Sequence, residues 1–231
     1  MSTRSAWTAP LVLTLLLLGI AVAWDRLGLD LALAQRMGSP AGFPLREDWW
    51  LRQLLHDGAR RLAWVLGCVL AAGVAWPFGF FERLRFERRV QLAASVLLAT
   101  GIVALVRSTS HTSCPWDLVD FGGLARYQSH WASWFVDDGG PGHCFPSSHA
   151  AAGFAFVAGW FALRWDLPRL ASWWLAGSLL LGLLFGLVQQ LRGAHFMSHT
   201  LWTAAICAVV GWALDTVLFL WRARTPARAQ S

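Results

Sequence analysis

Residues 171–188 read ASWWLAGSLLLGLLFGLV, a stretch without a single charged side chain. At 1.5 Å of rise per residue it forms a helix about 27 Å long, close to the ~30 Å hydrocarbon thickness of a bilayer. A helix in the core of a soluble protein seldom needs so long an apolar run. The stretch therefore predicts a transmembrane helix.

Similar runs recur along the whole chain, which has 231 residues of which 56% are hydrophobic and 14% are charged. The run at 150–165 is short, but it extends upstream through residue 147. No internal repeat divides the chain, so we expect one all-α integral membrane domain over residues 1–231 with six transmembrane helices. The five further runs are 6–24, 62–81, 90–106, 150–165 and 201–221.

The first run has an alternative interpretation. Arg4, an apolar core and the small residues at 21–23 also fit a cleavable signal peptide. Residues 6–24 are longer than the usual signal core of about 7–15 residues, so an uncleaved helix is favoured. Either interpretation leaves the rest of the topology unchanged.

The distribution of arginine predicts the orientation. All 19 basic residues are arginines, and ten of them stand in short segments with few acidic residues, before the first run, after the second and fourth runs, and in the polar tail at 222–231. The other nine arginines are spread over the longer connections 25–61, 107–149 and 189–200, where nine of the 13 acidic residues offset them. The positive-inside rule therefore places both termini in the cytoplasm. All seven histidines then fall outside, or at helix ends that face the outside.

The connector at 25–61 is predicted to contain an amphipathic helix within residues 43–64. Trp49, Trp50 and nearby leucines can share one face of this helix, with Arg46 and Arg52 mostly elsewhere. Such a helix lies in the membrane interface. It serves either as a platform for lipid entry or as a plain connector, and the second interpretation is favoured.

Three short segments at the outer ends of predicted helices carry the chemistry. Residues 107–117 read RSTSHTSCPWD, residues 144–149 read CFPSSH and residues 192–199 read RGAHFMSH. Arginine side chains and the free N–H groups of a helix start suit a bound anion. Two histidines on different helices can divide the work of nucleophile and proton donor. The combination favours phosphoryl transfer through a phosphohistidine.

Each segment alone has a simpler interpretation. The stretch 146–149 can be only a helix N-cap, and Arg107 can be an interfacial anchor. His195 and His199, four residues apart on a helix, can be a pair of metal ligands. Their shared side and their helix-end positions favour the phosphoryl-transfer interpretation.

The four cysteines fall into two classes. Cys68 and Cys207 lie inside apolar runs and are expected to be core residues. Cys114 and Cys144 lie in one outer loop, where an oxidising compartment favours a disulfide of about 3–4 kcal/mol. Two free thiols are the alternative.

These segments resemble the type 2 phosphatidic acid phosphatase family, whose fold is shared with vanadium haloperoxidases. The family pattern is Lys, six residues, Arg-Pro; then Pro-Ser-Gly-His; then Ser-Arg, five residues, His, three residues, Asp. Arg107 falls at the Lys position, residues 146–149 match the second element, and residues 193–198 resemble the stretch around the nucleophilic histidine. The resemblance covers roughly residues 60–220.

The chain departs from the family pattern at four positions. Ser148 stands at the Gly position, Cys114 and Gln189 stand at Arg positions, and His199 stands at the position of the Asp that orients the nucleophile. Arg192 lies one helical turn nearer His195 than the missing arginine. These variants resemble a bacterial subgroup of the family.

The resemblance implies a role for each matching residue. His195 attacks phosphorus, and His149 protonates the leaving group and then activates water. Arg107, Arg192, Ser147 and Ser148 hold the phosphoryl oxygens. No metal and no other cofactor are implied. The residues expected to orient or support the nucleophile are His199, Asp117 and Asp120.

The predicted function is a phosphatase that acts on a lipid phosphate or pyrophosphate. Its expected location is the bacterial inner membrane with the active site facing the periplasm, and neither nucleic acid nor an obligate protein partner is expected. The alternatives are a lipid phosphotransferase of the same fold, a histidine-rich metal-binding or transport protein, and a catalytically impaired relative that binds lipid head groups.

Overall fold

A computed structural model gives the fold of residues 3–224 and the side chains within that range except those at 3–7, 54–57, 59, 60 and 223. The His56 side chain and residues 225–231 of the predicted tail therefore lie outside the described residues. The described chain is 71% helical and contains no β-strand, as expected of an all-α protein. Eight α-helices follow one another: α1 (Thr3–Leu27), α2 (Leu29–Ala34), α3 (Gly58–Ala75), α4 (Phe86–Ser108), α5 (Ser148–Phe154), α6 (Val157–Leu163), α7 (Pro168–Leu191) and α8 (Met197–Arg224).

Four described helices are long and apolar enough to cross a membrane, namely α1, α4, α7 and α8. Large apolar side chains on their outer faces are exposed, for example Leu16 (57%), Leu105 (64%) and Leu180 (68%). Outward-facing apolar surface on this scale suits lipid and not water. Two shorter apolar segments, 61–75 and 148–163, correspond to the other expected runs, so the count of six spans stays a prediction.

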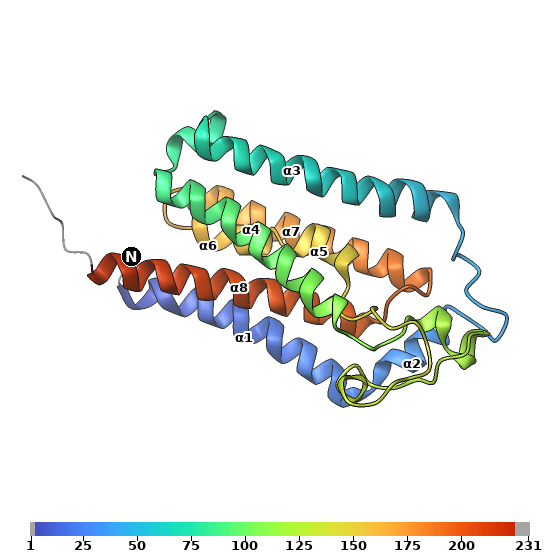
Figure 1. Cartoon of the computed structure of the whole chain (residues 1–231). Coiled ribbons are helices and arrows are strands. Elements are labelled where there is room, and N and C mark those ends of the chain that lie inside the picture. Colours follow the sequence, from blue (N-terminus) through green and yellow to red (C-terminus); the bar gives the residue numbers. More distant parts are fainter. Residues whose placement is uncertain (1–2, 225–231) are drawn as a thin grey trace, which may run out of the picture.

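The fourth apolar run forms two short helices, where one helix was predicted. The chain tightens between α5 and α6, where Phe156 N–H bonds Gly153 O (3.2 Å) and Ala158 N–H bonds Ala155 O (3.2 Å). The pair lies inside the bundle, against α4, α7 and α8 (Figure 1). Small residues permit this position, because a Cβ on Gly153 would lie 2.7 Å from Gly182 Cα of α7.

The second apolar run ends earlier than its hydropathy predicted. α3 stops at Ala75 because Pro77 follows and disfavours a helical residue before it. A 3₁₀ turn, η2 (Gly79–Arg83), then folds back and buries Phe81 against Gly73 of α3. Phe81 is therefore core packing and not the end of a span.

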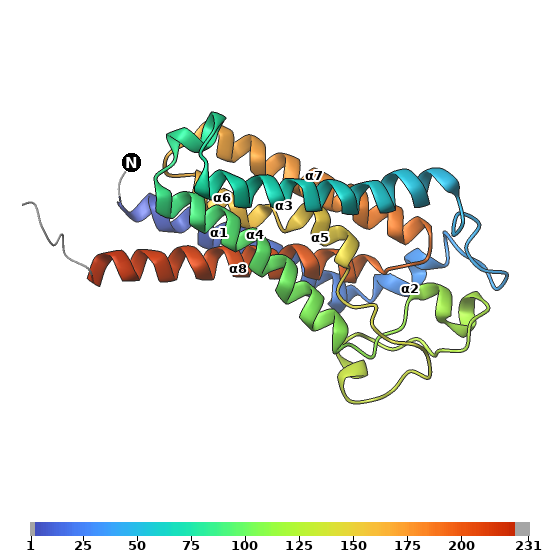
Figure 2. The same ribbon diagram turned by 45° about the horizontal axis from the view of Figure 1, so that its top comes forward.

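The predicted interfacial helix at 43–64 is not a separate element. Residues 44–47 form turns, and the π-helical segment η1 (Trp50–Asp57) continues through Gly58, in helical conformation, into α3. Figures 1 and 2 show α3 and η1 as one long rod at the edge of the bundle. Amphipathic pattern alone did not distinguish a helix lying on a membrane from the first turns of a longer helix.

The two ends of the bundle differ in character. The start of α1 and the end of α8 lie at one end, and α2 with the long loop between α4 and α5 lies at the other (Figure 1). That loop contains three short 3₁₀ turns, η3 (Pro115–Asp117), η4 (Val119–Phe121) and η5 (Ala132–Trp134). The three segments singled out in the sequence all lie at this second end.

Candidate active site

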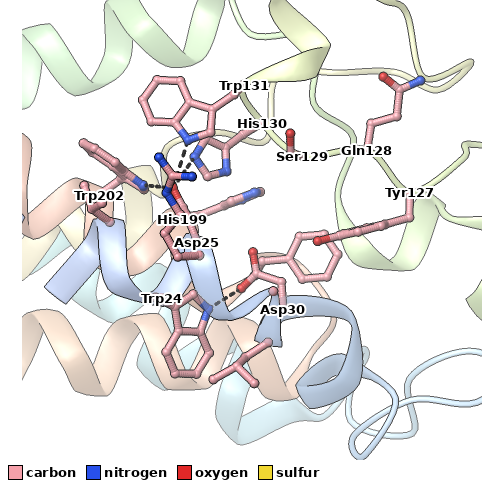
Figure 3. A pocket seen from close by; sticks show the side chains of 15 residues that line it. Trp24, Asp25, Asp30, Tyr127, Gln128, Ser129, His130, Trp131, His199 and Trp202 are labelled. Atoms are coloured by element: carbon pink, nitrogen blue, oxygen red, sulfur yellow. Dashed lines mark hydrogen bonds and ion pairs between the residues drawn. The ribbon is translucent and has the colours of Figure 1, made fainter. Parts of the chain in front are cut away.

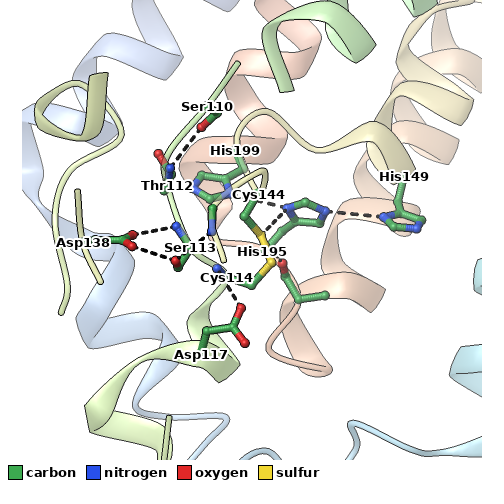
Figure 4. Close-up of a disulfide and its surroundings, with 12 residues drawn as sticks. Ser110, Thr112, Ser113, Cys114, Asp117, Asp138, Cys144, His149, His195 and His199 are labelled. Atoms are coloured by element: carbon green, nitrogen blue, oxygen red, sulfur yellow. Dashed lines mark hydrogen bonds between the residues drawn. A yellow bond between two sulfur atoms is a disulfide. The ribbon is translucent and has the colours of Figure 1, made fainter. Parts of the chain in front are cut away.

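Backbone contacts bring the three segments together. Cys114 and Cys144 form a disulfide with their Cα atoms 5.2 Å apart, and Cys144 N–H donates to Thr112 O (2.9 Å). Trp116 N–H donates to Gly193 O (2.9 Å), which joins the first segment to the third. The loop after α4 is thereby held over the starts of α5 and α8 (Figure 4).

Three histidines form a continuous row at this point, which we call the histidine row (His149, His195 and His199). His149 Nδ1 lies 3.4 Å from His195 Nε2, and His195 Nδ1 lies 3.4 Å from His199 Nδ1. His195 and His199 are buried, whereas His149 is half-buried at the first turn of α5. Figure 4 shows the middle ring with one neighbour on each side. His195 therefore has one ring nitrogen toward the protein interior and the other toward the more open side.

Two histidines of the row, His195 and His199, were also candidate metal ligands in the sequence. Cys144 Sγ, His195 and His199 place their ligand atoms within 4.8 Å of one another. Cys144 is bonded to Cys114, however, and a disulfide sulfur offers no thiolate. The two remaining imidazoles are fewer than the three protein ligands of a catalytic zinc site. The donor set fits a metal poorly.

The two candidate anion-binding arginines sit at helix ends. Arg107 is in the last turn of α4, and its buried Nε has no hydrogen-bond partner among the described residues. Arg192 follows α7 directly, where Nε donates to Arg46 O (3.0 Å) and Nη1 donates to Gln189 Oε1 (3.2 Å). Gln189, at a family arginine position, thus holds the arginine that lies one turn later.

The serines start α5. Ser147 Oγ accepts the N–H of Ala150 (3.3 Å) and so caps the helix, while Ser147 N–H donates to Thr203 Oγ1 (3.0 Å) on α8. Ser147 is fully buried, and Ser148 is the first helical residue, half-buried. These bonds fix the position of His149, two residues after the cap.

The two aspartates predicted as orienting residues occupy other positions. The Asp117 carboxylate accepts the N–H of Cys114 (3.3 Å), and burial raises the pKa of this carboxyl. Asp120 lies in η4. The nitrogen of His195 that an orienting residue would contact, Nδ1, faces His199 instead.

Two other aspartates support the histidine row, and the sequence motifs did not reveal them. Asp30 of α2 accepts hydrogen bonds from both the N–H (3.0 Å) and the hydroxyl of Ser198, and from Trp24 Nε1 (2.7 Å). Ser198 is in the first turn of α8, where a carboxylate also complements the helix dipole. Burial raises the pKa of Asp30 despite these donors. The contact positions the helix that carries His199.

Asp25, at the end of α1, has a similar role. Its Oδ2 accepts Trp131 Nε1 (2.9 Å) and Trp202 Nε1 (2.8 Å), and it lies 3.3 Å from His130 Nε2 (Figure 3). The His130 ring stacks on Phe145, with centroids 4.1 Å apart. Asp25 thus joins α1, the outer loop and α8.

These groups line a cavity of about 420 Å³ (Figure 3). Asp25, Asp30, His130 and Tyr127 face it, and so does His199, which is also the inner neighbour of the nucleophile candidate. Burial and the two aspartates raise the pKa of Tyr127 to about 12, so its hydroxyl stays protonated. In the sequence, these contacts of Asp25 and Asp30 were indicated only by Ser198 and Trp202, which stand on either side of His199.

The buried His130 makes stability depend on pH. Burial lowers the pKa of His130 from 6.5 to about 4, against the opposing effect of Asp25. The unfolded chain therefore binds the proton more readily, so the stability from a neutral His130 is complete above pH 6.5 and is lost as the pH falls toward 4. Lowering the pH to about 4.5 should reduce the free energy of unfolding of the wild-type protein by about 2–3 kcal/mol more than that of the His130→Gln variant. Unfolding in detergent at both pH values measures this, and equal losses would contradict it.

Comparisons with known proteins are consistent with this arrangement. A family model described as the PAP2 superfamily matches residues 88–224, more than half of the chain. Searches of curated proteins and of solved structures give no match. The matched range begins in α4 and ends in α8, and it includes all three segments and the whole histidine row. The chain therefore belongs to the PAP2 superfamily, whose members are phosphatases.

Proposed function

We propose that this protein hydrolyses a lipid phosphate or pyrophosphate at the outer face of the bacterial inner membrane, through a phosphohistidine on His195. The observation that carries the proposal is the histidine row, which presents Nε2 of a buried histidine to a second histidine on another helix. Arg107 is in the last turn of α4, and Arg192 follows α7 directly, three residues before His195 in the chain.

The proposed nucleophile needs one particular tautomer, and the row offers a partner for it. A neutral imidazole has one N–H and one lone pair. If His195 Nδ1 carries the hydrogen and donates it to His199, the lone pair is on Nε2, on the side of His149. His199 thus does what the family aspartate does at this position, since it accepts from Nδ1 and fixes the ring. Asp25 stabilises this arrangement through its contact with His130, and Asp30 does so through its hydrogen bond with Ser198.

The reaction then takes two steps. His195 Nε2 forms a bond to phosphorus while the bond from phosphorus to the lipid oxygen breaks, and protonated His149 gives its proton to that oxygen. In the second step His149 takes a proton from water, the water oxygen attacks phosphorus, and the bond to Nε2 breaks to release phosphate. His149 is half-buried, so its ring can make room for the phosphoryl group.

Fixed positive groups stabilise the charge that develops on the phosphoryl oxygens. Arg107 offers a buried Nε that lacks a partner among the described residues, and Arg192 is held in place by Gln189 and Arg46 O. The first backbone N–H groups of α5, at Ser148 and His149, add donors. Each such donor contributes about 10²–10³ in rate. Ser147 acts by capping the helix that presents them.

The orientation follows from the arginine distribution. The arginine-rich segments lie at the end of the bundle opposite the histidine row, with Arg88 and Arg164 both near the ends of their helices there. By the positive-inside rule that end is cytoplasmic, so the active site faces the periplasm.

Phosphate release from a panel of lipid phosphates tests the proposal. We expect the purified protein in detergent to release phosphate from at least one long-chain phosphate or pyrophosphate, equally well with and without a chelator. Release that requires an added metal would contradict the phosphohistidine scheme, and binding without turnover would favour the impaired-relative alternative.

A further inference from the structure

A second concave surface lies in the apolar part of the bundle, between α3, α5 and α7. Its volume is about 210 Å³, and its walls include Leu66 of α3, Ala152 and Gly153 of α5, and residues of α7 from Trp173 to Phe185. We call it the α3–α5–α7 groove. It does not contain any residue of the histidine row.

The groove is elongated. Its lining on α7 runs from Trp173 to Phe185, and these twelve steps of 1.5 Å amount to about 18 Å along the helix axis. Gly177 and Trp173, which is 79% exposed, both line it. A Cβ at Gly177 would meet nothing within 4 Å, so the missing side chain there leaves open space on α7.

The surface of the groove is almost entirely hydrocarbon. Its two polar side chains on α7 already have partners, since Trp174 Nε1 donates to Phe156 O (2.7 Å) and Ser178 Oγ donates to Trp174 O (2.7 Å). A ligand bound here is therefore stabilised by dispersion and by the removal of apolar surface from water. It receives no hydrogen bond from these two groups.

Two of the helices that line the groove, α5 and α7, also carry or adjoin candidate site residues. Ala152 comes three residues after His149 on α5, so the two share one helix face at adjacent turns. On α7, Phe185 lies seven residues before Arg192, about two turns away. A molecule whose phosphate contacts His149 and Arg192 can thus extend its other end directly into the groove.

We propose that the α3–α5–α7 groove binds the hydrocarbon chain of the phosphate ester while its phosphate is at His195. This inference rests on the proposed function and adds that substrate choice depends on one long apolar chain. Lipid, and not a protein partner, is the occupant because the helices around the groove expose large apolar side chains, such as Leu62 of α3 and Leu180 of α7.

Filling the groove tests this inference. A Cβ at Gly177 would meet nothing within 4 Å, so Gly177→Leu places a side chain in the groove without a backbone clash. Gly101→Leu is the matched control, because Gly101 of α4 is equally unobstructed and does not line the groove. We expect Gly177→Leu to raise KM for a long-chain phosphatidate by about tenfold, with para-nitrophenyl phosphate turnover within about twofold of wild type. Gly101→Leu should change neither.

The outcomes separate the two proposals. Equal effects of Gly177→Leu on both substrates, or equal effects of the two leucine variants, would overturn the groove assignment. If wild type hydrolyses no lipid phosphate or pyrophosphate of the panel, the proposed function fails, and the groove is then tested by binding. A phosphatidate with a photoreactive group in its chain should label peptides of α5 and α7 in wild type and much less in Gly177→Leu; labelling elsewhere would overturn the assignment.

Discussion

Replacing His195 by alanine is expected to lower phosphate release at least about 10⁴-fold, since removal of a covalent nucleophile costs this much or more in enzymes that use one. In the proposed mechanism, the variant loses the nitrogen that forms the bond to phosphorus. Arg107, Arg192 and the α5 backbone remain, so weak binding of the lipid phosphate should persist. The measurement is release of phosphate by purified protein, together with labelling by a substrate carrying radioactive phosphorus.

The matched control is His111→Ala. His111 lies in the same outer loop but is exposed and is not part of the histidine row. It should retain nearly full activity, and wild type should carry an acid-labile, alkali-stable phosphoryl group that His195→Ala lacks. Undiminished release by His195→Ala would reject His195 as the nucleophile, whatever the control shows.

Replacing Asp215 by asparagine is expected to destabilise the protein by about 3–5 kcal/mol, the usual cost of leaving a buried charge without its partner. Asp215 of α8 is 3% exposed and accepts from Arg88 Nη1 (3.3 Å) and Arg164 Nη2 (2.6 Å). Gln91 Nε2 also donates to it (2.9 Å). Without the carboxylate, two guanidinium groups from α4 and from the end of α6 repel each other in a buried space.

The control for Asp215 is Glu87→Gln at the same end of the bundle. The Glu87 side chain is 50% exposed and lies 3.5 Å from Arg222, so its loss should cost under about 1 kcal/mol. Unfolding in detergent micelles should show a midpoint roughly 10 °C lower for Asp215→Asn and nearly unchanged for Glu87→Gln. Similar midpoints for the two variants would show that the Asp215 cluster does not stabilise the fold.

At two positions that depart from the family motifs, the structure shows other groups in contact with the same segments. Cys114 stands where the family has an arginine, and its disulfide ties the first segment to the second. His199 stands where the family has an aspartate, and the carboxylates that support the row, Asp25 and Asp30, come from the end of α1 and from α2. In the structure, these carboxylates contact His130 and Ser198.

Much of the architecture was predictable because it depends on short-range patterns. Apolar runs of sufficient length must form helices in a bilayer, since every backbone polar group needs a partner there. Those runs correspond to α1, α3, α4, α5 with α6, α7 and α8. The candidate residues at helix ends were also recognisable, because helix starts and adjacent arginines bind anions wherever they occur.

The remaining features depend on contacts between segments far apart in the chain, which no local pattern encodes. The fourth run divides into α5 and α6, and α5 packs closely against α7 at Gly153 and Gly182. The joining of η1 to α3, and the role of Gln189 in holding Arg192, are likewise set by neighbours in space.

The sequence by itself therefore determined that this is a helical membrane protein, and it singled out the histidines and arginines that we propose for phosphoryl transfer. Only the tertiary structure decided which groups support them. Asp30 meets Ser198 across 168 residues of chain, and Asp25 meets Trp202 across 177. The physical reason is that a hydrogen bond depends on distance in space, and spacing along the chain does not specify that distance once the helices have packed.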